Sequence, residues 1–172
     1  MLRFVAGIVT TIVVLAMLAF VVVKFGLVPA TANGSPSPLE RLMAHASLDA
    51  TVERDAPKPP YPFPSSVAAI VAGAKLYTDH CAMCHGSAVG EPTILAKGLY
   101  IAPPQFVKHS VEDDPEGATY WKIEHGIRFT SMPSYKDNLT EEQIWQITYF
   151  VKNLPDRLPP EAQAEWRKPA SE

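Results

Sequence analysis

Both cysteines of the chain lie within five residues, in the segment Cys81-Ala82-Met83-Cys84-His85. Two thiols separated by two residues and followed directly by a histidine form the pattern C-x-x-C-H, which attaches c-type haem. The thiols add to the two vinyl groups of the porphyrin, and the adjacent histidine reaches the iron as an axial ligand. The sequence therefore predicts one covalently bound haem c, attached through Cys81 and Cys84, with its iron bound by His85.

Two other chemistries use closely spaced cysteines. A redox dithiol sits within a βαβ pattern, and a zinc site needs a second pair of ligands at similar spacing. No strand pattern precedes Cys81, and the chain has no third cysteine. The haem interpretation is therefore favoured over both.

The iron has a sixth position, and its occupant decides whether such a protein carries electrons or binds ligands. Met132, His109 and His125 are the downstream candidates. Met132 is followed by Pro133, which restrains it to extended backbone and makes a core-packing role a poor explanation. We expect Met132 to be the sixth ligand, with a gap-filling core methionine as the alternative. His125 precedes a glycine at a helix end, which favours a surface or capping role.

The elements that position these residues are helical. The pattern predicts a helix over 67–80 that begins at Ser65 or Ser66, and a second over 118–125. A third begins at a capping box formed by Thr140 and Gln143. No alternating strand pattern is present, so the fold class is all-α.

An uncharged apolar run from Phe4 to Val23 precedes this region. Twenty helical residues span about 30 Å, the thickness of a bilayer core. A cleaved secretory signal is the alternative, because Ala30-Thr31-Ala32 offers a cleavage site, but signal cores are usually about 7 to 15 residues long. We expect residues 1–28 to form a retained transmembrane anchor.

Residues 29–64 contain eight of the seventeen prolines. This composition favours an extended, semi-rigid spacer that keeps a haem domain near its partners. A possible short amphipathic helix interrupts it, since Leu39, Leu42, Met43 and Ala46 keep helical spacing. The haem domain is expected over residues 65–158, followed by a polar, loosely attached tail over 159–172.

The haem region resembles the class I c-type cytochromes, in particular the bacterial membrane-anchored monohaem cytochromes c. The resemblance covers about 67–154 and rests on several positions besides the haem motif. They are Gly73 and Tyr77 before the motif, Trp145 and Tyr149 on the last helix, and Gly126 six residues before Met132-Pro133. In this family the last helix crosses the first at the glycine, and a missing side chain permits that approach.

The resemblance implies a cytochrome c fold, with three main helices around one covalent haem, after a single transmembrane helix. It leaves open which carbonyl accepts the ring N–H of His85, because the loop from Gly98 to Pro104 departs from many relatives. Trp121, Arg128 and Tyr135 are expected either to contact haem propionates or simply to pack.

The function expected from these features is a membrane-tethered electron carrier between respiratory or photosynthetic partners, alone or as a subunit of a larger oxidoreductase. It is not expected to be an enzyme or to bind a small-molecule substrate. Haem c is attached outside energy-transducing membranes, so we expect a bacterial inner-membrane protein with its haem domain in the periplasm. The alternative is a haem protein with a labile sixth ligand that binds a gas or reduces peroxide.

Charge and composition exclude other classes. An apolar fraction of 47% is that of a folded or anchored protein. The net charge of −3 does not suggest a nucleic-acid partner. A small acidic cluster either steers a basic redox partner or is a solvated loop. Its members are Glu112, Asp113, Asp114 and Glu116.

Overall fold

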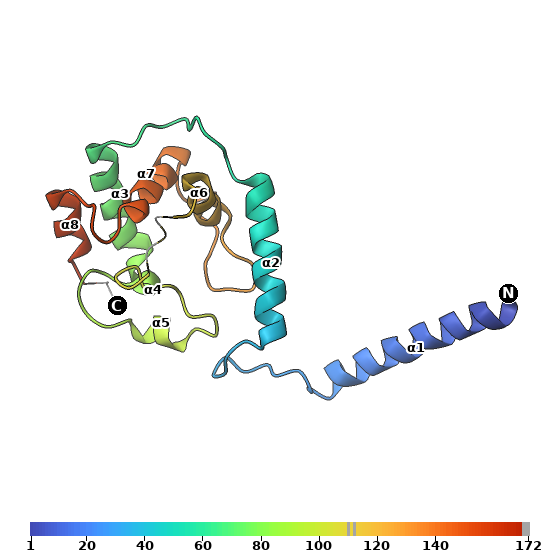
Figure 1. Ribbon diagram of the computed structural model, residues 1–172. Coiled ribbons are helices and arrows are strands. Elements are labelled where there is room, and N and C mark those ends of the chain that lie inside the picture. Colours follow the sequence, from blue (N-terminus) through green and yellow to red (C-terminus); the bar gives the residue numbers. More distant parts are fainter. Residues whose placement is uncertain (110, 112, 170–172) are drawn as a thin grey trace. The chain divides into compact units, whose positions relative to one another are not determined.

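The computed structural model describes residues 1–109, 111 and 113–169, and these residues form helices and loops with no β-strand (Figure 1). The helices, in chain order, are α1 (Leu2–Lys24), α2 (Pro38–Asp55), α3 (Val67–His80), α4 (Ala82–His85), α5 (Ile94–Gly98), α6 (Glu116–His125), α7 (Glu141–Lys152) and α8 (Pro160–Trp166). The chain divides into two compact units, Met1–Ala32 and Asn33–Glu172. The predicted all-α fold class is confirmed.

The first unit contains α1, none of whose residues is buried. Its length corresponds to about 35 Å at the helical rise. By length and composition α1 is the one helix among the described residues that can cross a membrane, and a signal sequence near an N-terminus has the same properties.

The second unit begins with a longer helix than we expected. The spacer was predicted to be extended with a possible short helix, whereas α2 is 18 residues long. Ser37 and Glu40 form a reciprocal capping box at its start, with Pro38 as its first residue. Such a box satisfies two otherwise unpaired backbone N–H groups, and Pro at the first position costs no hydrogen bond. This local signal, Ser-Pro-Leu-Glu, outweighs the proline-rich composition around it.

The centre of this unit is the crossing of α3 and α7. Their predicted starts are confirmed, since Ser66 caps α3 and Thr140 caps α7 in a box with Gln143. At the crossing, a Cβ placed on Gly73 would lie 2.0 Å from the carbonyl oxygen of Gln146. The two helices can approach this closely only because Gly73 has no side chain.

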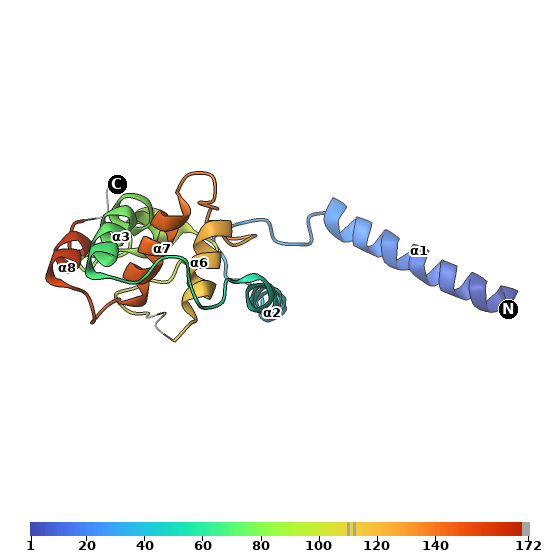
Figure 2. The same cartoon turned by 90° about the horizontal axis from the view of Figure 1, so that it is seen from above.

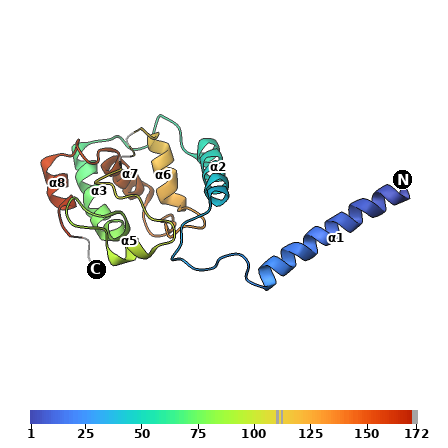
Figure 3. The same ribbon diagram turned by 60° about the horizontal axis from the view of Figure 1, so that its bottom comes forward.

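The other helices lie on either side of this pair. Figures 1 and 3 show the order α8, α3, α7, α6 and α2 across the unit, in agreement with the contacts between neighbouring helices. In Figure 2, α2 is seen nearly end-on beside α6. Within α2, only Val52 is buried, near the C-terminal end, and the hydroxyl of Tyr100 donates to the carboxylate of Glu40 in the first turn.

Residues 57–64 also pack on the helices instead of extending away. The ring of Tyr61 lies 4.6 Å from that of Trp145, and the hydroxyl of Tyr149 donates to the carbonyl of Phe63. Trp145 also stacks on Tyr120 at 4.4 Å. Trp145 and Tyr149 therefore contact this segment and α6, whereas the backbone beside them meets Gly73. We propose that the haem unit begins before residue 65.

The C-terminal segment differs from the loosely attached tail that we expected. Helix α8 packs on α3, with Ala162 fully buried and Trp166 4% exposed. The backbone N–H of Ala88 donates to the carbonyl of Trp166, which joins α8 to the loop after α4. Burial of Ala162 and Trp166, together with this hydrogen bond, anchors a helix whose sequence is otherwise polar.

We expect Gly73→Ala to destabilise the haem-loaded protein by about 2–4 kcal/mol, because the new methyl group would meet helix backbone that cannot move aside. Gly98→Ala is the matched control, since its Cβ would meet nothing within 4 Å. Chemical unfolding of both variants measures the difference. Equal stabilities would show that the crossing is not as close as described.

Candidate haem site

The end of α3 leads directly into the expected haem-attachment segment. The N–H of Cys81 donates to the carbonyl of Tyr77, and the N–H groups of Cys84 and His85 both donate to the carbonyl of Cys81. Gly86 ends this turn with φ +79°. Cysteines three residues apart in a helical turn lie on the same face, so both thiols can reach one edge of a flat ligand.

The thiols are free and are not suited to redox exchange. Neither cysteine forms a disulfide. Burial, and then the neighbouring Cys84 thiol, raise the pKa of Cys81 to about 12. A reactive dithiol requires a lowered pKa, because the thiolate is the nucleophile. This environment therefore argues against the redox alternative.

His85 is oriented by a carbonyl on the loop after α5. Its Nδ1 lies 2.9 Å from the carbonyl oxygen of Pro104, which identifies the carbonyl that the sequence left open. Burial lowers the pKa of His85, and the Pro104 hydrogen bond opposes this shift. A neutral imidazole that donates from Nδ1 keeps the lone pair of Nε2 available for a metal.

Helix α3 also holds the chain just beyond His85. The hydroxyl of Tyr77 is buried in the core and donates to the carbonyl of Gly86 at 2.7 Å. Burial raises the pKa of Tyr77 well above its usual value, so the phenol remains a donor. The segment is thus fixed to α3 at both of its ends.

Met132 lies on a loop that folds back on the end of α6. Gly126 has φ +67°, and a Cβ there would lie 2.6 to 2.7 Å from the backbone of residues 132–134. The N–H of Ile127 donates to the carbonyl of Met132, and the N–H of Met132 donates to the hydroxyl of Thr130. Met132 is partly buried against the core.

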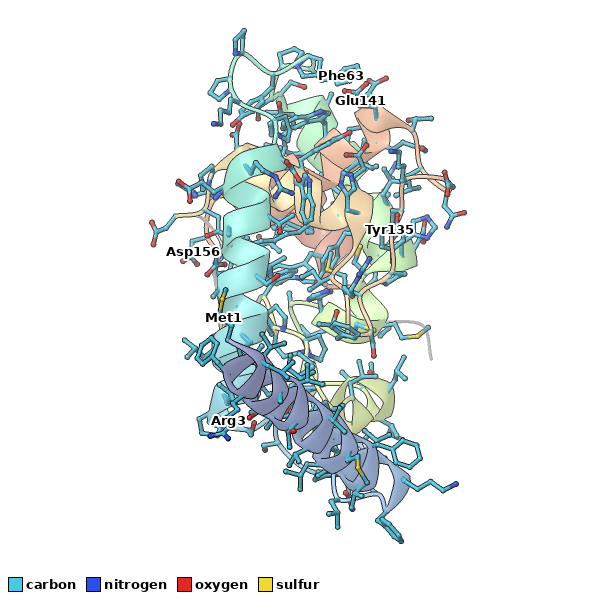
Figure 4. The ribbon with its side chains drawn as sticks, turned by 90° about the vertical axis from the view of Figure 1, so that its right-hand side faces the viewer. Met1, Arg3, Phe63, Tyr135, Glu141 and Asp156 are labelled. Carbon is cyan, nitrogen blue, oxygen red and sulfur yellow. The ribbon has the colours of Figure 1, made fainter. Side chains whose placement is uncertain are left out.

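The same loop is tied to α3 beside the haem-attachment segment. The hydroxyl of Tyr135 donates to the carbonyl of His80 at 2.8 Å. Burial first, and then the two thiols, raise the pKa of Tyr135 to about 12, so it stays protonated as a donor. Figure 4 shows Tyr135 lying away from the end of the unit at which Phe63 and Glu141 are found. Tyr135 therefore joins the loop that carries Met132 to the residue before Cys81, a contact that the sequence did not reveal.

The other candidate ligands are on the surface. His125 is exposed, with its ring stacked on Trp121 at 4.6 Å and its Nδ1 3.2 Å from the Trp121 carbonyl. His109 and Arg128 are also exposed. This agrees with the surface role expected for His125. Trp121 contacts His125 and Tyr135 contacts His80, so both make packing contacts within the protein.

The chemistry of these residues fits a haem. Two unpaired thiols, a neutral imidazole with a free Nε2 and a thioether are the groups that covalent attachment and axial ligation require. Large apolar side chains are exposed on α4, on α5 and on the loop before Met132, as an apolar macrocycle needs. They are Met83, Ile94, Leu95 and Phe129. No group of three His, Cys, Asp or Glu side chains in the described residues can hold a bare metal ion.

The acidic region is partly occupied by internal contacts. The carboxylate of Asp114 pairs with Lys122 at 3.0 Å, and the ammonium of Lys152 donates to the carbonyls of Val111 and Asp114. Glu112 lies outside the described residues. A separate pocket of about 640 Å³ is lined by residues of α6 and its neighbours and contains none of the four expected haem-site residues.

We expect Gly126→Ala to destabilise the haem-loaded protein by about 2 kcal/mol more than Gly90→Ala. Both glycines have positive φ, but only Gly126 has backbone atoms where a Cβ would lie. Both variants therefore place alanine at a positive φ, and the difference between their free energies of unfolding measures how closely the Met132 loop approaches Gly126. Denaturant unfolding of both variants gives the comparison, and equal losses would contradict the loop geometry.

Comparison with known proteins also supports a domain that binds haem covalently. The family model described as "Cytochrome C oxidase, cbb3-type, subunit III" matches residues 68–151. The quinohemoprotein alcohol dehydrogenase ADH-IIG of Pseudomonas putida is 35% identical over 104 residues, which are 59% of this chain. The match spans only 13% of that protein's length. No solved structure gives a significant match.

The family match contains both cysteines, His85 and Met132. A cytochrome c domain implies covalently bound haem with iron and a role in electron transfer. The helical fold, the haem-attachment segment and the family match together show a c-type cytochrome domain over residues 68–151.

Proposed function

We propose that this protein is a membrane-tethered electron carrier with a single haem, attached through Cys81 and Cys84 and ligated by His85 and Met132. The environment of His85 carries the proposal. Its Nδ1 is bonded to the Pro104 carbonyl, its pKa is lowered by burial, and it directly follows two free thiols. These are the conditions under which Nε2 binds iron.

Each residue has a separate role. Bound haem would supply an iron that alternates between Fe(II) and Fe(III). Cys81 and Cys84 would hold the porphyrin in place, and His85 and Met132 would bind the iron. A thioether ligand favours the reduced iron and raises the potential. Tyr135 restrains the Met132 loop, so that the ligand position is kept when the charge of the site changes.

We propose that α1 anchors this carrier in the bacterial inner membrane, with residues from Asn33 onward in the periplasm. The support is the length and composition of α1 and the outer-face assembly of c-type haem. The partners we propose are redox proteins or subunits of a membrane oxidoreductase. The support is that the matching family is described as an oxidase subunit and the relative as a quinohemoprotein dehydrogenase.

We expect Met132→Ala to convert a low-spin, six-coordinate haem spectrum into a high-spin one, because the sixth position loses its protein ligand. Absorption spectra of the oxidised and reduced protein measure this change. Met43→Ala is the control, because Met43 is exposed on α2 and belongs to none of the haem-site segments, and its spectrum should stay that of the unaltered protein.

Carbon monoxide added to the reduced protein separates the proposal from its alternative. The unaltered protein should not respond, whereas Met132→Ala should bind the gas. A response of the unaltered protein would favour the gas-binding or peroxide-reducing haem protein. An unchanged spectrum in Met132→Ala would contradict the assignment of Met132.

The anchor is tested independently by intact-mass analysis of the native protein. We expect a mass that retains residues 1–32 and includes one haem. A mature chain that begins at Asn33 would mean that α1 is a cleaved signal. Protein that is released from membranes by detergent but not by high salt would agree with a retained anchor.

A further inference from the structure

The loop that carries Pro104 holds the haem-attachment segment through a second residue. The side-chain amide of Gln105 donates to the carbonyl of Cys84 at 2.9 Å and to the carbonyl of Pro103 at 3.1 Å. Both amide hydrogens are thus used. One bond ties the loop to the residue before His85, and the other ties Gln105 to its own loop, one residue before Pro104.

Gly86 provides the space for this side chain. A Cβ on Gly86 would lie 2.7 Å from the Oε1 of Gln105, and Gly86 has φ +79°. The amide of Gln105 therefore lies across the end of the turn that carries His85. A larger residue at position 86 would displace it, so the glycine serves the Gln105 contact as well as the turn.

Phe106 completes the contact on the face of the His85 ring. The two rings are stacked with centroids 4.8 Å apart and an interplanar angle of 6°. The N–H of Phe106 donates to the carbonyl of His85 at 3.3 Å. Phe106 is itself buried against Tyr77 in the core, so it offers the imidazole a fixed surface.

We infer that Gln105 is a positioning residue that holds the Pro104 carbonyl against the His85 ring and thereby lowers the reduction potential of the haem. This rests on the proposed function, in which His85 binds the iron. A firm hydrogen bond from Nδ1 makes the imidazole a more basic ligand, and a more basic ligand stabilises Fe(III) relative to Fe(II). Phe106 limits rotation of the ring, and Gln105 limits movement of the carbonyl. The two contacts act on the same hydrogen bond from different sides.

Gln105→Met tests this role, because methionine has a similar length and no amide donor. We expect the ratio of Fe(II) to Fe(III) at a fixed solution potential to rise about two- to tenfold, the effect of weakening one hydrogen bond. Spectroelectrochemical titration of the full-length, haem-loaded protein measures the ratio. Gln163→Met is the matched control, because Gln163 is exposed on α8, and its titration should match that of the unaltered protein.

A Gln105→Met protein that has the unaltered spectrum and the unaltered potential would overturn the inference, whatever its stability. If that variant does not accumulate with haem, the unaltered protein gives the answer by NMR. In the reduced, ¹⁵N-labelled protein, the side-chain amide protons of Gln105 should exchange slowly with solvent and show NOEs to Cys84. Rapid exchange without those NOEs would overturn the inference. The proposed function fails on a different result, namely an unaltered protein without covalent haem or with a carbon monoxide response.

Discussion

The close approach of α3 and α7 at Gly73 is the constraint on which the site depends. Gly73 lies eight residues before Cys81, a distance of about 12 Å along the helix, so the crossing sets the position and direction of the helix end that carries the cysteines. The same helix supplies Tyr77, whose hydroxyl binds the carbonyl of Gly86 beyond the histidine. The helix crossing that Gly73 permits therefore determines where the two thiols and the imidazole lie.

Both sides of the proposed haem site are attached to this helix end. The loop with Pro104 reaches it through His85, and the loop with Met132 reaches it through Tyr135 and the carbonyl of His80. The Met132 loop is also bonded to α6, since the N–H of Tyr135 donates to the carbonyl of Ile123. Ligands held from a common support keep their separation, and such a site needs little rearrangement when its charge changes.

Local sequence signals predicted the haem-attachment segment and the starts of the main helices. The spacing of Cys81, Cys84 and His85 directly predicts covalent haem attachment. The capping box of Thr140 marks the start of α7 to within one turn. What was missed depends on residues far apart in the chain. Pro104 is 19 residues from His85, and Tyr135 is 55 from His80. No periodicity reports such contacts, because tertiary packing alone brings them together.

Packing of the proline-rich region on the haem unit makes the flexible tether shorter than the sequence predicted. A Cβ on Gly117 would lie 1.9 Å from the carbonyl oxygen of Pro57, so this segment lies directly on α6. On the proposed topology, a spacer over 29–64 would reach roughly 120 Å when extended, whereas the non-helical residues 25–37 reach only about 45 Å. A shorter reach raises the effective concentration of the carrier near membrane partners.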